Sequence, residues 1–212
     1  MDMIHTRKQL VHAVEHLVAV EPRFKDIVET HGLPPLRKLP PGAPTLFQIV
    51  TDQLISRTAA RAIWSRIVSG ISPMTAERVA ASSESELRRL GLTGAKARAF
   101  LAISQADILG HFDQKYMRSL DDNKARAHLM QISGIGPWTA EIYLLSALGR
   151  PDAWPAGDVA LQNATAHLFE LSVRPDVQEM GRLSAPWRPL RSVAARLLWC
   201  HYRGMSRNPL GK

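Results

Sequence analysis

The sequence is organised around residues 129–161, LMQISGIGPWTAEIYLLSALGRPDAWPAGDVAL. Within this stretch, ISGIG at 132–136 joins one segment of helical apolar spacing to another. The second segment begins at Pro137, a favoured first residue of a helix. Two glycines around Ile135 let the backbone turn tightly, and Ile135 itself can anchor the turn in the core. The stretch therefore predicts two helices joined by a short hairpin.

The hairpin also has the features of a phosphate-binding turn. Without side chains at Gly134 and Gly136, a bulky ligand can approach the backbone closely. The first amides of the next helix, up to Thr139, point outward and favour an anion. Such a turn holds nucleic acid without reading its sequence, because phosphate contacts position a protein and base contacts specify. A plain helix–turn–helix corner is the alternative, and it explains the glycines but not Pro137-Trp138.

The segment WPAGDVAL at residues 154–161 places one carboxylate at the start of a helix. Asp158 follows Pro155 and Gly157, and its ordinary role there would be that of an N-cap. A carboxylate in this position is also stabilised by the helix dipole, which suits an electrostatic catalyst. The two roles of Asp158 are compatible.

The composition is that of a folded globular protein. Of 212 residues, 45% are apolar and 22% are charged. No apolar run approaches the ~18 residues of a membrane span, and the N-terminus does not read as a secretory signal. The single cysteine, Cys200, excludes an internal disulfide and the multi-cysteine ligand sets of zinc and iron–sulfur proteins. We therefore expect a cytoplasmic protein with no membrane attachment.

The charge balance points to an anionic partner. Lys and Arg number 27 against 19 Asp and Glu, which gives a net charge of +8. Residues 180–212 contain no Asp or Glu and carry Arg182, Arg188, Arg191, Arg196, Arg203, Arg207 and Lys212. An unpaired basic segment predicts contact with phosphates, although a solvated basic face is the plain alternative.

Apolar residues recur at helical spacing along almost the whole chain, and no stretch of useful length alternates as a strand would. We therefore predict an all-α fold. One long helix is expected to be capped by Thr45 and to carry Leu54 on its apolar stripe as far as Ile67. The other helices are expected at about 6–20, 75–80, 84–90, 94–109, 116–120, 122–131, 137–148, 158–171 and 186–203.

Residues 1–44 stand apart in this prediction. After the first helix, prolines at positions 34, 35, 40, 41 and 44 exclude helix and favour an extended course. We expect this segment to pack on a core of residues 45–212. That core is expected to comprise a first helical lobe at 45–125 and a second part at 126–212, which holds the hairpin and Asp158.

The hairpin followed by the Pro/Asp segment resembles the helix–hairpin–helix DNA glycosylase superfamily, and within it the 3-methyladenine DNA glycosylase II branch. Three further stretches are similar to this branch. They are LFQIVTDQLISRTAARAIWSR at 46–66 with its Gln-Leu pair, GLTGAKARAFLAIS at 91–104 with its lysine, and PWRPLRSVAARLLW at 186–199. The resemblance covers about residues 40–205 and implies a two-lobed all-α fold with the active site in the cleft between the lobes.

The resemblance also implies roles for individual residues. Asp158 matches the catalytic aspartate, and Trp138 stands where bifunctional members carry the lysine that forms a Schiff base. Trp138 and Trp199 match aromatics of the base pocket, with Tyr143 beside the position of a third. A tryptophan that simply packs in the core is the alternative for Trp138 and Trp199. The residue before the aspartate is often acidic in the branch and is Gly157 here.

DNA contacts are implied for the hairpin residues Gly134, Ile135, Gly136 and Thr139, and for Gln53, Leu54 and Lys96. Leu54 matches the wedge that fills the gap left by a flipped base, and an ordinary core leucine is its alternative. Lys96 can reach a phosphate or can simply be solvated.

The resemblance further implies a monovalent cation, Na⁺ or K⁺, held by the hairpin carbonyls of Met130, Ile132 and Ile135. No cofactor is expected to be required for catalysis.

The implied function is that of a monofunctional DNA glycosylase in base-excision repair. It would act as a monomer on double-stranded DNA, flip out an alkylated purine of the 3-methyladenine type and hydrolyse its N-glycosidic bond. Two alternatives stay open: a helix–hairpin–helix module that binds DNA without chemistry, and a glycosylase for other damaged or deaminated bases.

Overall fold

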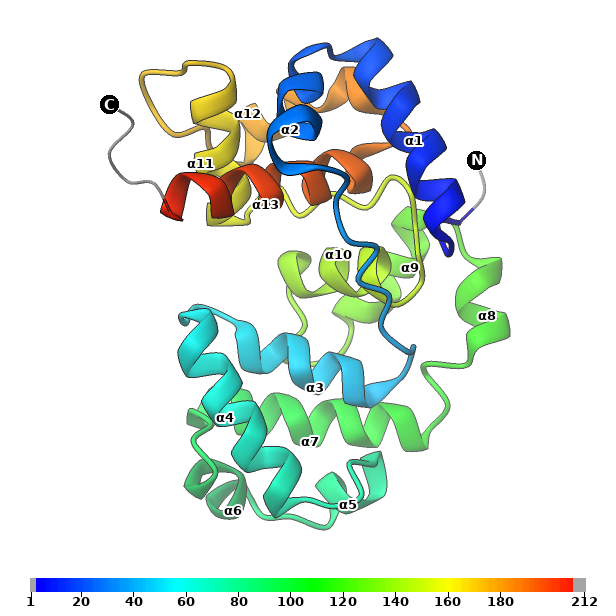
Figure 1. The fold of residues 1–212 in the computed structure, drawn as a ribbon. Coiled ribbons are helices and arrows are strands. Elements are labelled where there is room, and N and C mark those ends of the chain that lie inside the picture. Colours follow the sequence, from blue (N-terminus) through cyan, green and yellow to red (C-terminus); the bar gives the residue numbers. More distant parts are fainter. Residues whose placement is uncertain (1–2, 208–212) are drawn as a thin grey trace. The chain divides into compact units, whose positions relative to one another are not determined.

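Every regular element in the computed structural model, which describes residues 3–207, is a helix (Figure 1). The predicted all-α fold is therefore confirmed. Among residues 3–207 no helix combines the length and apolar character needed to cross a membrane. The chain divides into two compact units. The terminal unit contains residues 1–38 and 149–212, and the central unit contains residues 39–148.

The central unit is built from eight of the helices in the part of the chain that the structure describes. They are α3 (Ala43–Asp52), α4 (Arg57–Gly70), α5 (Ala76–Ala80), α6 (Glu84–Arg89), α7 (Gly94–Ile108), α8 (Gln114–Ser119), α9 (Asp122–Met130) and α10 (Pro137–Ser146). Helix α3 packs against α7 and α10, and Phe47 stacks on Phe100 with ring centroids 4.7 Å apart. This packing places the hairpin between α9 and α10 beside the residues that follow α3.

The terminal unit joins the two ends of the described chain. It contains α1 (Arg7–Val20), α2 (Arg23–His31), α11 (Val159–Leu168), α12 (Val177–Leu183), a short 3-10 turn (Ala185–Trp187) and α13 (Arg191–Arg207). Helix α13 packs against α1, α2 and α11. The buried ring of Trp187 lies edge-on to Phe24 and Trp154, with centroids 5.1 and 5.6 Å away. Helices α2 and α12 were not expected from the sequence.

The two units divide the chain differently from the lobes expected at 45–125 and 126–212. Residues 1–38 belong with 149–212, and the hairpin belongs with 39–148. A hydrogen bond from the Gly42 amide to the Tyr143 hydroxyl, 2.8 Å long, fastens α10 to the start of α3. The expected extended course between the first helices and α3 is present, since residues 32–42 contain no helix.

The single long helix expected from Thr45 to Ile67 is wrong. Helix α3 begins at Ala43 after Gly42 and ends at Asp52. Ser56 then caps α4, because its hydroxyl accepts a hydrogen bond from the Ala59 amide at 3.2 Å. The break exposes Leu54 completely, with a side chain at 102% of its reference accessible area. The core alternative for Leu54 is therefore excluded.

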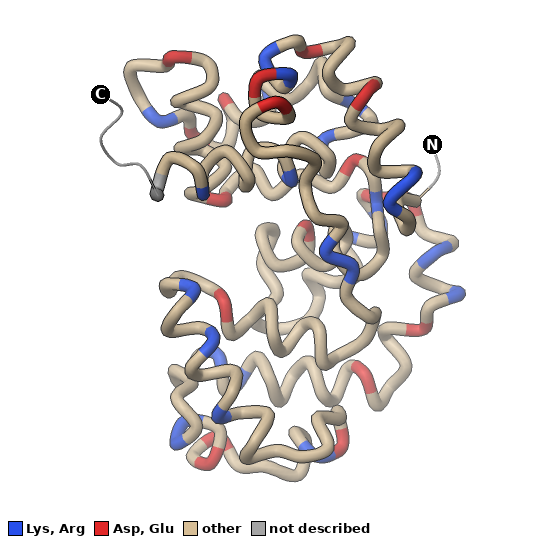
Figure 2. The backbone as a smooth tube through the Cα atoms, in the orientation of Figure 1, with Lys and Arg blue, Asp and Glu red and all other residues tan. Residues whose placement is uncertain are grey.

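The basic C-terminal segment is not the unpaired one that the sequence predicts. Arg191 makes a bidentate ion pair with Asp152, at 2.7 Å to each carboxylate oxygen, and Arg188 adds a third contact at 3.2 Å. Arg182 pairs with Glu179. The buried Arg196 donates to the Leu36 carbonyl. Lys212 lies outside the described residues. Figure 2 shows that basic residues are spread over both units.

Candidate active site

Asp158 is the N-cap of α11, as its local sequence predicts. Its Oδ1 accepts the Leu161 amide hydrogen at 3.0 Å. The turn before it is closed by the Asp158 amide, which donates to the Pro155 carbonyl at 2.9 Å. Gln162 braces the same turn from within α11, because its side chain donates to the Ala156 carbonyl at 3.0 Å. The carboxylate is thus held at a fixed place at the start of the helix, and it is only partly buried.

Trp199 of α13 supplies a second hydrogen bond to the same oxygen. Its indole Nε1–H donates to Asp158 Oδ1 at 3.2 Å. The contact follows from the packing of α11 on α13, which lets a side chain of one helix reach the cap of the other. The structure therefore brings together two of the sequence-predicted site residues, and it adds a role for Trp199 that its place in a base pocket did not suggest. A carboxylate oriented in this way can stabilise positive charge on a sugar.

The two glycines of the hairpin lie in different surroundings. Gly134 has φ +89°, and a Cβ built on it would overlap the Cβ of Ala99 on α7. Gly134 is therefore required by packing inside the central unit. Gly136 has φ −90°, and a Cβ built there would meet no atom within 4 Å. The open space beside Gly136 fits the expected close approach of a ligand to the backbone, whereas the packing against Ala99 is by itself enough to explain the glycine at 134.

Ile135 anchors the turn as predicted, since its side chain is buried and its amide donates to the Ile132 carbonyl at 3.0 Å. Each peptide oxygen has two lone pairs, so this hydrogen bond leaves the Ile132 carbonyl able to ligate a cation as well. Neutral carbonyls from one tight turn suit a monovalent cation, and the set expected from Met130, Ile132 and Ile135 fits on this ground. Among residues 3–207 no group of His, Cys, Asp and Glu side chains is arranged to hold a metal ion.

Two residues of α10 are less accessible than their predicted roles require. Thr139 is 2% exposed, and its hydroxyl accepts a hydrogen bond from Gln53, so its side chain is unsuited to a DNA contact. Tyr143 is fully buried, and burial raises the pKa of its hydroxyl to about 12. This argues against Tyr143 as part of a base pocket and indicates a packing residue. Trp138, in the first turn of α10, is partly exposed and stays available for that role.

Residues 53–56 form the loop between α3 and α4, and the structure brings Gln53 and Lys96 together there. Gln53 Nε2 donates to the Gly134 carbonyl at 3.3 Å and to Thr139 Oγ1 at 2.8 Å. Lys96 Nζ donates to the Thr51 carbonyl at 2.9 Å and to the Gln53 carbonyl at 2.8 Å. Burial raises the pKa of the nearby Asp52, against the opposing charges of Arg57 and Lys96. Sequence analysis missed this arrangement, because a lysine at a helix start gives no signal of which carbonyls it will reach.

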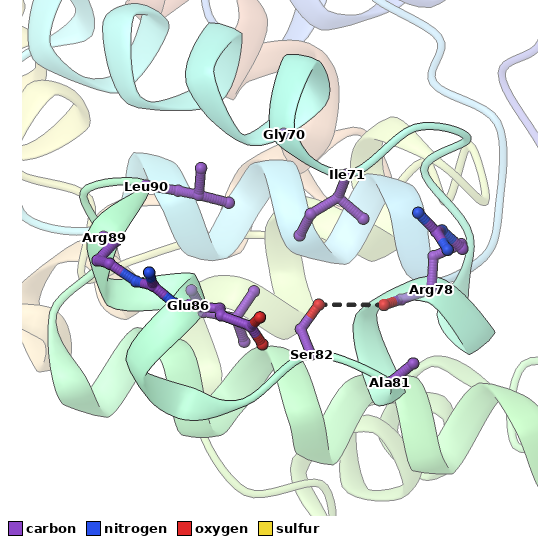
Figure 3. A pocket seen from close by; sticks show the side chains of 9 residues that line it. Gly70, Ile71, Arg78, Ala81, Ser82, Glu86, Arg89 and Leu90 are labelled. Atoms are coloured by element: carbon purple, nitrogen blue, oxygen red, sulfur yellow. Dashed lines mark hydrogen bonds between the residues drawn. The ribbon is translucent and has the colours of Figure 1, made fainter.

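A hollow of about 440 Å³ lies elsewhere in the central unit, where the end of α4 meets α5 and α6 (Figure 3). Buried Ile71 and Leu87 and exposed Arg78 and Arg89 contribute to its lining. None of the sequence-predicted site residues lines this hollow.

A profile of the HhH-GPD superfamily of base excision DNA repair proteins matches residues 47–189 of the chain. The chain belongs to this superfamily. The matched span includes Gln53, Leu54, Lys96, the hairpin and Asp158, whereas Trp199 lies beyond its end.

Two relatives from Schizosaccharomyces pombe match most of the chain. DNA-3-methyladenine glycosylase 1 is 30% identical over 198 residues, which cover 90% of this chain and 86% of that protein. The alkylbase DNA glycosidase-like protein mag2 is 26% identical over 194 residues, which cover 88% of this chain and 91% of that protein. The solved structure of the S. pombe 3-methyladenine DNA glycosylase Mag1 in complex with abasic DNA has a TM-score of 0.82 to this chain at 27% identity. It covers 94% of this chain and 98% of its own.

Proposed function

We propose that the chain is a monofunctional DNA glycosylase that removes alkylated purines from double-stranded DNA. The observation that carries the proposal is the Asp158 carboxylate, held by the Leu161 amide and the Trp199 indole at the start of α11. The relatives support the substrate class, because they are named as 3-methyladenine or alkylbase glycosylases. A DNA ligand is supported by Mag1, which is solved with abasic DNA.

The first step of the proposed reaction is extrusion of the damaged nucleotide. A base inside a duplex is out of reach, and flipping it out costs on the order of a few kcal/mol, less when the base is damaged. Leu54, fully exposed on the loop between α3 and α4, is suited to fill the gap. The open backbone at Gly136 and the first amides of α10 would hold a phosphate.

The second step is cleavage of the N-glycosidic bond. Alkylation at N3 or N7 makes a purine cationic, and the ring face of a tryptophan, Trp138 or Trp199, would attract it by ~0.5–2 kcal/mol. A cationic base leaves without a general acid. As the bond breaks, Asp158 would stabilise the oxocarbenium-like sugar and orient or deprotonate the attacking water.

Trp138 supports the proposal of hydrolysis without strand cleavage. A lysine amine at this position would attack the sugar and form a Schiff base, and an indole cannot do so. We include in the proposal a structural Na⁺ or K⁺ on the carbonyls of Met130, Ile132 and Ile135, and action as a monomer in the cytoplasm.

A panel of duplexes tests the proposal, each carrying one modified base: 3-methyladenine, 7-methylguanine, hypoxanthine or an etheno adduct. Base release is measured directly, and strand breaks are measured before and after alkali. We expect release of an alkylated purine, with breaks only after alkali. DNA binding without release of any of these bases would favour the non-catalytic module. Release of hypoxanthine alone, the deaminated base of the panel, would favour the alternative of a glycosylase for other damaged or deaminated bases. Strand breaks before alkali would contradict monofunctional hydrolysis.

A further inference from the structure

The loop that carries Leu54 has an unusual backbone. Leu54 has φ +54°, in the left-handed region that residues other than glycine seldom adopt. Its side chain has no packing to hold it there, since it is fully exposed. Such a conformation persists only when the surrounding structure fixes it. The contacts that fix it must therefore come from residues next to Leu54 in the chain.

Lys96 provides the first of these contacts. The carbonyls of Thr51 and Gln53 lie at the end of α3, where backbone oxygens have no partner inside the helix. Lys96 Nζ donates to both, at 2.9 and 2.8 Å, and places a positive charge at the negative end of the helix dipole. Two of the three ammonium hydrogens are used in this way. The side chain is partly buried, and burial lowers the pKa of Lys96 against the opposing charge of Asp52.

Gln53 provides the second contact. Its side-chain amide reaches the Gly134 carbonyl at 3.3 Å and the buried Thr139 hydroxyl at 2.8 Å. The residue directly before Leu54 is thus tied to the hairpin through its side chain and to α7 through its carbonyl. Both groups that were expected to touch DNA, the Lys96 ammonium and the Gln53 amide, are engaged inside the central unit.

We propose that Lys96 and Gln53 form a clamp that holds Leu54 outside the fold, and that Lys96 is a positioning residue for base flipping. In this assignment Lys96 acts through Leu54 and is not a phosphate ligand. The clamp also links the loop to the hairpin, so the side chain that enters the base stack and the turn that holds the backbone share one rigid support. The proposal rests on the proposed function, in which Leu54 fills the gap left by the flipped base.

The test compares Lys96→Met with a matched control, Lys115→Met, which removes the same charge from an exposed lysine on α8. Base release is measured on a duplex and on a single strand that carry the same lesion. We expect Lys96→Met to lower release from the duplex about tenfold. Release from the single strand, where no stacked gap has to be filled, should stay unchanged, as should both activities of the control. Lys96→Arg keeps donors for both carbonyls and should keep most of the base release from the duplex. An equal loss on both substrates would overturn the clamp.

A double-mutant cycle and a salt titration separate the clamp from a phosphate contact. In a Leu54→Ala background, Lys96→Met should cause no further loss on the duplex, because a residue that acts through Leu54 has nothing left to position. A loss of the same size in both backgrounds would contradict the proposal. The salt dependence of duplex binding should also be unchanged, whereas a lost phosphate contact would lower the slope of log K against log salt by ~0.9.

Failure of the proposed function would leave the clamp testable. If the unaltered protein releases no base from either substrate, the proposed function fails, and amide hydrogen exchange of residues 53–56 then reports on the clamp alone. Faster exchange in Lys96→Met than in Lys115→Met would support it. Identical exchange in the two variants would overturn it.

Discussion

The carboxylate of Asp158 combines two tasks in one side chain. It completes the start of α11 by accepting the Leu161 amide, and it is oriented from α13 by the Trp199 indole. A capping carboxylate has a fixed position, because its helix cannot begin elsewhere without losing the cap. The same geometry that stabilises α11 therefore supplies a preorganised negative charge, the form of catalysis that needs no rearrangement during the reaction.

Trp199→Phe tests the orienting contact. The change removes the indole N–H that reaches Asp158 Oδ1 and keeps an aromatic ring at the same place. Loss of one hydrogen bond to a charged group, ~1.5–2 kcal/mol, should lower kcat by about tenfold. Trp64→Phe, the same replacement on α4, is the control and should leave kcat unchanged. Equal kcat values for the two variants would show that the indole does not orient the carboxylate.

At the scale of residues, the sequence predicts local hydrogen bonds better than it predicts which side chains are buried. Asp158 is correctly predicted as an N-cap, because the cap signal is local. Thr139 and Tyr143 could not be placed, since α10 is apolar on most of its surface and its sequence does not tell which face is inside. Lys96 could not be assigned to its carbonyls either, because Thr51 and Gln53 reach it only through the packing of α3 on α7.

At the scale of elements, the hairpin between α9 and α10 is fixed by more than its turn. Arg126 of α9 pairs with the buried Glu141 of α10, and Gln53 ties the turn to the end of α3. The turn itself fits against α7 only because Gly134 has no side chain. The hairpin is therefore a rigid support, consistent with a part that positions a ligand through its backbone.

The two hairpin glycines give a matched pair of variants. Gly134→Ala combines a strained φ with overlap at Ala99 and should lower the free energy of unfolding by about 2–4 kcal/mol. Gly136→Ala faces open space at an ordinary φ, but alanine is a poorer N-cap than glycine. This cost and the lower entropy of the unfolded chain should roughly offset each other, so stability should change by less than ~1 kcal/mol. The added methyl group should instead weaken duplex binding.

Denaturant unfolding and duplex titration measure both effects. If Gly134 were replaceable without loss of stability, the packing argument for that glycine would be wrong. If Gly136→Ala bound DNA as the unaltered protein does, close approach of a phosphate at that turn would be excluded.

The sequence predicts the boundaries of a helix where a capping signal interrupts the apolar spacing. It misses a boundary where the apolar spacing continues across the break. The apolar spacing runs through Leu54 without interruption, so it predicts one helix where α3 and α4 are separate. Ser56, the cap of α4, was the available signal of the break. Helix α12 was also missed, although Asp176 with Glu179 three residues later is a recognisable start signal, and Asp176 does cap it.

At the scale of the whole molecule, the terminal unit joins segments far apart in sequence. Arg196 of α13 donates to the Leu36 carbonyl in the extended segment, and Asp152 forms ion pairs with Arg188 and Arg191. The Arg196 contact and the packing of α13 on α1 and α2 explain why residues 1–38 join 149–212. The arginine pairings account for much of the basic charge that the sequence assigned to phosphates. No local pattern predicts them, because each partner is chosen by the tertiary fold.

Three histidines make the terminal unit sensitive to acid. His201 of α13 lies against His167 of α11, with ring nitrogens 3.0 Å apart, and near His31 of α2. Burial, together with the charges of His167 and His31, lowers the pKa of His201 from 6.5 to about 4. The unfolded chain therefore takes up a proton, between pH 6.5 and about 4, that the folded chain resists. The contribution of His201 to the free energy of unfolding is therefore complete above pH 6.5 and is lost as pH falls towards 4.

Denaturant titrations at pH 7 and pH 5 check this expectation. Since His201 is half-exposed and solvent screens its interactions, the expected loss is on the order of 1 kcal/mol. His201→Gln should remove that part of the pH dependence. The same drop in stability in the variant and in the unaltered protein would assign the acid sensitivity to other groups.

The central claim is that the Asp158 carboxylate performs the chemistry, and Asp158→Asn tests it most directly. Asparagine caps helices as well as aspartate does, so the variant should keep its fold. Single-turnover release of the alkylated base and affinity for the lesion duplex are measured side by side. The account predicts release lower by ~100-fold or more, with affinity within about threefold of that of the unaltered protein. Release at the unaltered rate, with the same affinity, would contradict it.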